Sequence, residues 1–170
     1  MAWTTPRTWT AGELVTKTIM DTHVRDNFNA IGPIYAKMKA VDETVNNSSV
    51  LQNDDDLLFS VLANEKYAVE LHLNISTGAT PDWKANWTKP AGATVTHCMA
   101  YNNTGTFQDW KTTDLGIVSS GSGAEAIHIW AAVIVGGTAG TIQFQWAQDT
   151  ANASNTIVKA GSYMIAQRIN

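Results

Sequence analysis

Thr141-Ile-Gln-Phe-Gln-Trp-Ala147 decides the fold class, because its apolar and polar side chains alternate along the chain. In an extended strand the isoleucine, phenylalanine and tryptophan would point to one side, and the threonine and glutamines to the other. A period of two is typical of a strand with one face in a core. The flanking runs, residues 126–135 and 162–169, are strand-like as well, and glycine-rich or polar turns separate them. The last third of the chain therefore predicts neighbouring strands.

The middle of the chain supplies partners for these strands. Lys66–Ser76 is the clearest half-buried antiparallel strand, because every second side chain from Tyr67 to Ile75 is apolar. Residues 51–62, 83–88 and 93–101 are three further candidates. Short strands separated by turn clusters indicate a mainly β fold, an antiparallel β-sandwich or barrel over residues 43–170. An extended N-terminal arm and a short α-helix, within residues 1–42, precede it.

The N-terminal segment has a different pattern. Thr10 and Glu13 have the spacing of a capping box, and Thr16 is a second possible helix start. The helix would end at Gly32-Pro33, and residues 34–42 are weakly helical. Trp3 and Trp9 lie in the arm. The two tryptophans either fold back onto their own domain or insert into a neighbouring protein. The helix has an apolar stripe at intervals of three and four residues: Met20, Val24, Phe28 and Ile31.

Composition excludes several classes of function. Charged residues make up 15% of the chain, against about 25% in average domains. A surface built from uncharged polar residues repels its own copies poorly, which favours an oligomer. The net charge is -4 and no Lys/Arg run occurs, so nucleic acid is not an expected partner. We find no signal peptide and no apolar run long enough for a membrane span, so no membrane insertion is expected.

The sequence offers few residues for catalysis. The histidines His23, His72, His97 and His128 show no metal-ligand spacing, although two of them could meet in space, and Cys98 lies in an apolar run. The run Asp54-Asp55-Asp56 is compatible with a cation site, but it lacks the spacing of a calcium loop and indicates a solvated turn. We therefore expect no enzyme activity, no catalytic residue, no cofactor and no metal.

Aromatic side chains suggest binding surfaces. Trp83 and Trp110 are candidate glycan contacts of a lectin-like module, although tryptophans more often fill a core or a subunit interface. In residues 126–135, Trp130 and Ile134 lie on the face opposite the predicted core face. A strand that is apolar on both faces suits a position between a core and a sister subunit.

Several motifs resemble proteins of tailed-bacteriophage virions. Thr8-Trp-Thr-Ala-Gly-Glu-Leu-Val-Thr16 and Met20-Asp-Thr-His-Val-Arg-Asp-Asn-Phe28 are similar to an N-terminal segment widespread in that family, although Asp21 stands where asparagine is usual. The motifs Leu51–Leu57, Gly137–Gln148 and Ala160–Tyr163 also resemble a phage structural family. The β-domain further looks like the trimeric jelly rolls of phage fibre heads and of the tumour necrosis factor type.

This resemblance implies a homotrimeric structural protein on the virion surface, made in the bacterial cytoplasm. Residues 1–42 would dock to other virion proteins through Trp3, Trp9 and the helix stripe. In such jelly rolls a terminal strand lies near the threefold axis, so Tyr163 and Ile165 would join Trp130 and Ile134 in the trimer interface. The expected location is a tail fibre or receptor-binding tip that contacts a host surface glycan or receptor. The alternative is a capsid decoration protein or head fibre.

Overall fold

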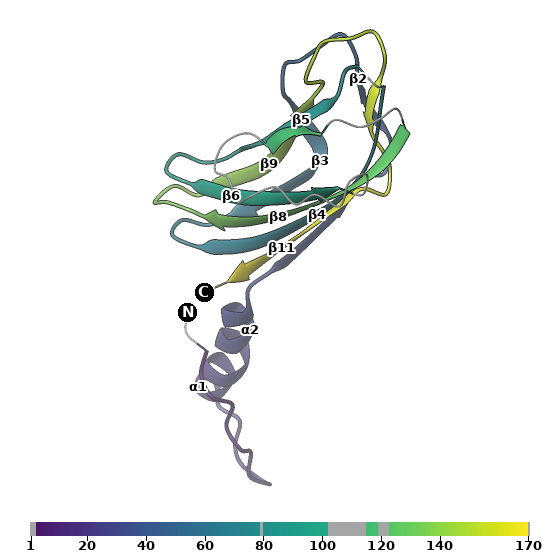
Figure 1. The fold of residues 1–170 in the computed structure, drawn as a ribbon. Helices are drawn as coiled ribbons and strands as arrows, with labels where there is room; N and C mark the ends of the chain where they lie inside the picture. The colour runs from purple at the N-terminus through teal and green to yellow at the C-terminus, as the bar shows by residue number, and fades with distance from the viewer. Residues whose placement is uncertain (1–2, 79, 102–114, 119–122, 170) are drawn as a thin grey trace. The chain divides into compact units, whose positions relative to one another are not determined.

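The computed structural model describes residues 3–78, 80–101, 115–118 and 123–169, and these divide into two compact units. The first unit ends at Ile34, and the second begins at Tyr35 and contains the β-sandwich (Figure 1). The division lies before the predicted boundary at residue 42, because residues 34–38 form a strand of the sandwich. The prediction of a weak helix over residues 34–42 is therefore wrong.

The first unit contains an extended arm and one helical segment. The segment consists of α1 (Lys17–Met20), a π-helical turn η1 (Asp21–Arg25) and α2 (Asp26–Ile31). Thr16 caps its start, since the Thr16 hydroxyl accepts a hydrogen bond from the Ile19 N–H (3.3 Å). Gly32 follows the helix with a φ of 76°, a conformation that suits glycine. The second of the two predicted helix starts is thus confirmed.

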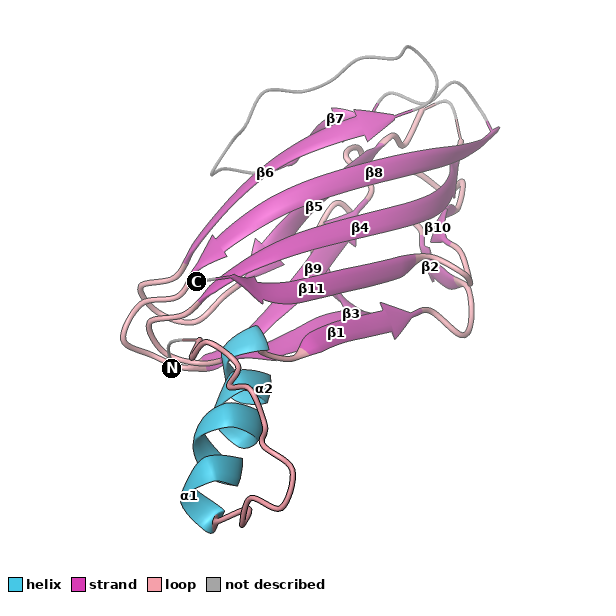
Figure 2. Ribbon diagram, turned by 90° about the horizontal axis from the view of Figure 1, so that it is seen from below, coloured by secondary structure: helices cyan, strands magenta, loops and turns pink. Residues whose placement is uncertain are grey.

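The second unit is a sandwich of two antiparallel sheets (Figure 2). In the described part of the chain, one sheet has seven strands: β1 (Ile34–Met38), β2 (Glu43–Val45), β4 (Lys66–Thr77), β6 (Thr94–Tyr101), β8 (Gly123–Ile134), β10 (Thr156–Val158) and β11 (Tyr163–Ile169). The other has four strands, in the order β3 (Gln52–Val61), β9 (Gly140–Ala147), β5 (Trp83–Thr88) and β7 (Leu115–Val118).

The order of the strands is that of a jelly roll. Between β2 and β10 every successive strand lies in the opposite sheet, so each connection crosses the sandwich. In the seven-stranded sheet β8 pairs with β6 and β4, and β4 pairs with β11 and β10 on its other edge. This double Greek-key winding brings together strands that are far apart in the chain. The mainly β, antiparallel sandwich fold predicted from the sequence is confirmed.

The core lies between the sheets and is filled by the alternating apolar side chains. On β4 the predicted inward set, from Tyr67 to Ile75, is at most 2% exposed. On β5 and β9 the inward residues include Trp83, Trp146 and Phe144, each with no exposed surface. Burial raises the pKa of Tyr67 to about 12. The Tyr67 hydroxyl donates to Glu65 (2.8 Å), so burial of this polar group is compensated.

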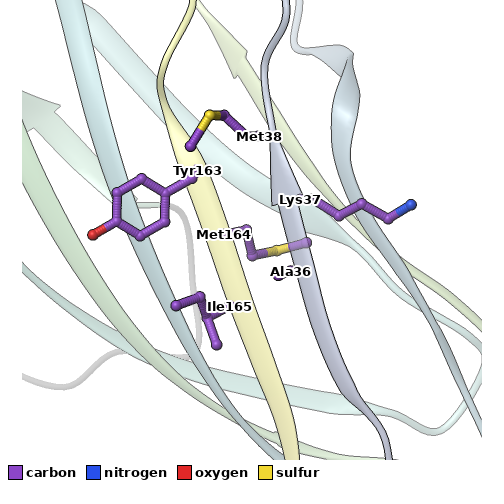
Figure 3. Close-up of a pocket in the computed structure, with 6 residues that line it drawn as sticks. All are labelled: Ala36, Lys37, Met38, Tyr163, Met164 and Ile165. Atoms are coloured by element: carbon purple, nitrogen blue, oxygen red, sulfur yellow. The ribbon is translucent and has the colours of Figure 1, made fainter.

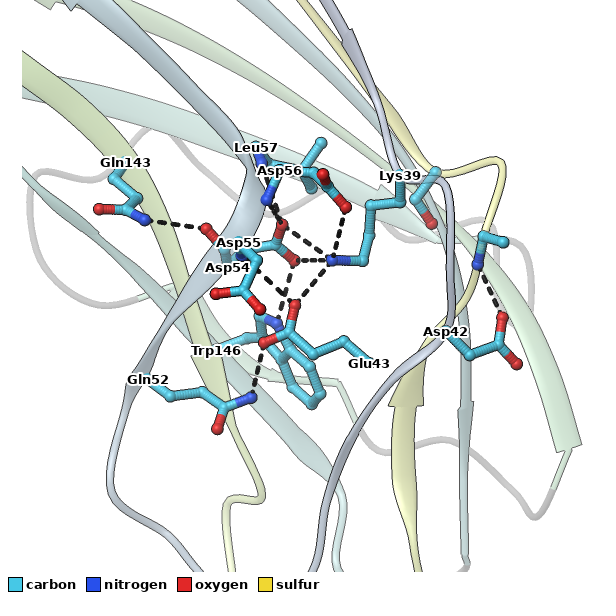
Figure 4. A network of polar contacts seen from close by, with 12 residues as sticks. Lys39, Asp42, Glu43, Gln52, Asp54, Asp55, Asp56, Leu57, Gln143 and Trp146 are labelled. Atoms are coloured by element: carbon cyan, nitrogen blue, oxygen red, sulfur yellow. Dashed lines mark hydrogen bonds and ion pairs between the residues drawn. The ribbon is translucent and has the colours of Figure 1, made fainter.

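Lys39, directly after β1, is the centre of a buried network of charges (Figure 4). Its Nζ donates to Glu43 (2.7 Å) and to both carboxylate oxygens of Asp54 (3.0 Å each). Asp54 is fully buried and also accepts hydrogen bonds from the N–H groups of Leu57 (3.0 Å) and Asp56 (3.1 Å). Burial tends to lower the pKa of Lys39, but its hydrogen bonds to Glu43 and Asp54 outweigh burial and raise it.

This network changes the interpretation of the three aspartates. They lie inside strand β3, where the pairing with β9 shifts register between Asn53 and Leu58, and not in a solvated turn. The Asp54 carboxylate there binds backbone N–H groups that the irregular ladder does not pair. The Lys39 ammonium supplies the positive charge beside Asp54, so the solvated-turn prediction is wrong.

Replacement of Lys39 by methionine should destabilise the sandwich strongly. The Lys39→Met change leaves the Asp54 carboxylate buried without its cation, and breaking a buried pair in this way costs about 3–5 kcal/mol. We expect a fall of that size in the free energy of unfolding, measured by urea denaturation. The control is Lys37→Met in the adjacent strand β1, where the side chain is exposed and the change should stay within about 0.5 kcal/mol. Equal effects of both substitutions would contradict the role of the network.

Candidate interaction surfaces

The arm of the first unit is fixed to the helix by one buried side chain. Asn27 is 5% exposed, and its amide forms two hydrogen bonds with the backbone of Thr4. The Thr4 N–H donates to Asn27 Oδ1 (2.9 Å), and Asn27 Nδ2 donates to the Thr4 carbonyl (2.9 Å). A second donation from Nδ2 reaches the His23 carbonyl (3.2 Å). The Asn27 amide therefore pairs with both backbone groups of Thr4, as the backbone of a neighbouring β-strand would, and holds the arm against the helix.

A short turn in the same arm orients Trp9. Arg7 pairs with Glu13, and the Arg7 guanidinium lies 5.2 Å from the centre of the Trp9 ring, within the range of a cation–π contact. The Thr10 N–H donates to Glu13 (3.3 Å), so the predicted capping-box pair closes a turn of the arm. It does not begin the helix, which starts at Lys17.

The predicted docking residues of the first unit are mostly exposed. Trp3 (54%), Phe28 (70%) and Ile31 (48%) retain large exposed fractions. Together with half-buried Val24 and other residues of the arm and helix, these three line a hollow of about 200 Å³. Trp9 and Met20 are also exposed but lie outside this lining. The structure thus brings together four of the six predicted residues: Trp3, Val24, Phe28 and Ile31.

The second surface is the outer face of the seven-stranded sheet. Strands β4, β6, β8 and β11 alternate, and their outward side chains include all four predicted interface residues: Trp130, Ile134, Tyr163 and Ile165. Within the described parts of these strands, Lys66 and Glu70 carry the only charged side chains on that face. Ile134 is 54% exposed and Ile165 40%. Most of this face is therefore apolar or aromatic, although no described part of the same unit covers it.

A row of stacked rings crosses the face. Register places Tyr163 opposite His72 and His72 opposite His128. The Tyr163 and His72 rings are nearly parallel, with centres 4.5 Å apart and an interplanar angle of 16°. The His72 and His128 rings are 3.8 Å apart, and Trp130 continues the row at 3.7 Å from His128. Burial and the neighbouring His72 lower the pKa of His128, so its imidazole is neutral at pH 7.

The face continues to the edge of the sheet as a groove between β1 and β11 (Figure 3). The groove has a volume of about 330 Å³ and an almost entirely apolar lining: Ala36, Lys37, Met38, Tyr163, Met164 and Ile165. Figure 3 shows that Tyr163 and Ile165 lie along β11 and Met38 lies across from them on β1. Two of the four predicted interface residues therefore also line this groove.

Other candidate residues do not form a surface site. Trp83 is fully buried in the core, where it packs near Phe144, so its prediction as a glycan contact is wrong. Trp110 lies outside the described residues. His97 is 2% exposed on the inner face of β6. Burial raises the pKa of the Cys98 thiol, so this cysteine has little thiolate at neutral pH.

Sequence reasoning treated His72 and His128 as separate strand residues, and it did not connect Glu70 with them. The structure brings the three side chains together. The signal that could have found this cluster is the pairing register of two strands more than fifty residues apart. One sequence does not supply that register.

Comparison of the chain with models of known protein families found no match, and comparison with curated proteins found none either. Among the described residues, every helix is too short or too polar to cross a bilayer.

Replacement of Asn27 by alanine should release the arm from the helix. Removal of these buried hydrogen bonds costs about 1–2 kcal/mol, which corresponds to about 5- to 30-fold faster local opening. Hydrogen–deuterium exchange at the Thr4 amide should accelerate by that factor. The control is Asn29→Ala, an exposed residue of the same helix, which should leave the Thr4 exchange rate close to that of the unmodified chain. Unchanged exchange in Asn27→Ala would show that other contacts hold the arm.

Proposed function

We propose that the chain is a non-enzymatic structural protein of the bacteriophage virion surface. In this proposal the β-sandwich associates as a homotrimer, and the N-terminal unit docks to other virion proteins. The observation that carries the proposal is the largely uncharged outer face of the seven-stranded sheet, in a chain whose first unit exposes a second apolar surface. The motif resemblance to phage structural proteins supplies the biological setting.

Self-association is supported by the chemistry of the outer face. Exposed Ile165 and Ile134 lie on β11 and β8 of the same face as the ring row. Burial of apolar surface is the main driving force for association. The opposite sheet differs, because Lys84, Asn86, Gln143 and Gln145 alternate outward on β5 and β9. The contrast between the faces favours the seven-stranded sheet as the interface. A polar outer face on the other sheet would then remain in water.

Docking is supported by the composition of the first unit. Trp3, Phe28 and Ile31 line a hollow in a unit that has few buried apolar residues of its own. Exposed aromatic side chains around a small hollow are typical of interface residues that become buried against a partner. This favours the hypothesis that the arm contacts another protein.

The proposed location is the tail, as a fibre or receptor-binding tip that contacts the host surface. A head location, as a decoration protein or head fibre, is the alternative. The number of copies in each particle separates the two, and quantitative mass spectrometry of purified virions measures it. A copy number comparable to that of the major head protein would favour the head, and a much smaller number would favour the tail.

A charge on the outer face should prevent trimer formation. We expect the full chain to sediment at three times its mass of 18.4 kDa, and Ile134→Glu to sediment as a monomer, because a carboxylate would be buried in the interface. Lys66 faces Ile134 across the strand pair and can bind the new carboxylate in the monomer, so the fold should persist. The control is Thr141→Glu on the outer face of the other sheet, which should remain trimeric. A monomeric full chain at micromolar concentration would refute the trimer.

Loss of the N-terminal docking surface should keep the protein off the particle. Virions assembled in the presence of a chain lacking residues 1–33 should not contain it, whereas the full chain should be incorporated. The double substitution Trp3→Ala and Phe28→Ala should reduce incorporation by about tenfold or more, since each removes an exposed aromatic anchor. The control is Leu14→Ala, an apolar arm residue that is 80% exposed and does not line the hollow. Incorporation of the truncated chain would show that docking uses the sandwich.

A further inference from the structure

The outer face contains a group of titratable side chains whose chemistry the proposed structural role does not require. Glu70 and His72 lie two residues apart on β4, so their side chains point to the same face. His128 lies directly opposite His72 on β8. One ligand atom from each residue lies within 4.8 Å of the other two. Residues directly opposite each other in an antiparallel pair point to the same side of the sheet. The backbone therefore presents two imidazoles and one carboxylate at one place.

The distances suit an ion between the side chains better than direct hydrogen bonds. Glu70 Oε2 lies 3.9 Å from His72 Nε2 and 4.0 Å from His128 Nε2. Hydrogen bonds between nitrogen and oxygen end near 3.2 Å, so neither contact is a good one. Zinc binds nitrogen and oxygen ligands at about 2.0–2.2 Å in tetrahedral sites, which places two ligand atoms of one ion about 3.4 Å apart. Small rotations of these side chains would bring all three atoms onto one ion.

The state of the His128 ring also favours a ligand role. His128 Nε2 has no hydrogen-bond partner among the described residues, although the atom is buried from solvent. An imidazole nitrogen binds a metal ion through its lone pair, and Nε2 is the atom of His128 that faces Glu70. A buried nitrogen lone pair without a donor is costly, and a bound cation would satisfy it.

Neighbouring rings restrict the orientation of both imidazoles. Tyr163 stacks on His72 and Trp130 packs beside His128, so the two rings are held between aromatic partners. A hollow of about 330 Å³, lined in part by His72, His128 and Trp130, opens next to them. It provides a path for a hydrated ion and room for water ligands.

We propose that Glu70, His72 and His128 bind one divalent transition-metal ion, of the zinc or nickel type, in each chain. A set of two imidazole nitrogens and one carboxylate oxygen binds such ions in preference to calcium or magnesium. All three ligands come from a single chain, so the site does not rest on the proposed trimer. It also departs from the sequence-based expectation of a chain without a metal.

Titration of the metal-free full chain with zinc chloride in an isothermal calorimeter tests the site. We expect one ion per chain, and a melting temperature that rises with zinc and returns to its starting value with EDTA. His72→Ala and His128→Ala should each weaken binding by more than about tenfold, and Glu70→Gln should weaken it less. The control is His23→Ala, which removes a histidine from the N-terminal unit and should bind zinc as the unmodified chain does.

Two additional measurements separate loss of a ligand from loss of the fold or of the trimer. His72→Gln keeps a polar side chain on the folded sheet, and its circular dichroism should match that of the unmodified chain while zinc binding falls. Ile134→Glu should bind zinc with unchanged affinity, because its substitution affects assembly and not the ligands. No saturable binding, binding that survives His128→Ala, or equal loss in His23→Ala would overturn the proposal. Loss of binding in folded Ile134→Glu would overturn the single-chain site.

Discussion

The buried pair between Lys39 and Asp54 is the interaction on which the packing of the two sheets depends. Lys39 belongs to the seven-stranded sheet through its backbone, because its N–H donates to the Ser162 carbonyl (2.8 Å) and its carbonyl accepts from the Gly161 N–H (3.0 Å). Asp54 belongs to β3 of the opposite sheet and also accepts from the Trp146 indole (3.2 Å). One ammonium group therefore joins both sheets at a point where neither could leave a charge unpaired.

This pairing also determines which surface is available for partners. Because Lys39 points into the core, the alternating residues Ala36 and Met38 point outward beside β11 and extend the apolar face to the edge of the sheet. The same face contains the ring row and the cluster of Glu70, His72 and His128. The proposed interface and the proposed ligand set therefore lie on the same sheet, and the Lys39–Asp54 pair ties that sheet to the opposite one.

Local periodicity was enough to predict the strands around Lys66–Ser76 and Thr141–Ala147, their buried faces, and the helix that follows Thr16. These features depend on residues that are close in the chain. The role of Lys39 was not predictable in this way, since a lysine between apolar residues is compatible with an exposed helix and its partner Asp54 lies in another sheet. The meeting of His72 with His128 likewise depends on long-range register.

The winding of the chain has a consequence for biosynthesis. Strand β9 lies between β3 and β5, and β11 pairs with β4, so both sheets receive strands that the ribosome makes after their neighbours. Until those segments emerge, earlier strands expose unpaired edges and apolar faces, the condition in which nascent β-proteins aggregate. The domain should therefore fold only after β11 has been made, and a chain that terminates before β9 should be insoluble or require a chaperone.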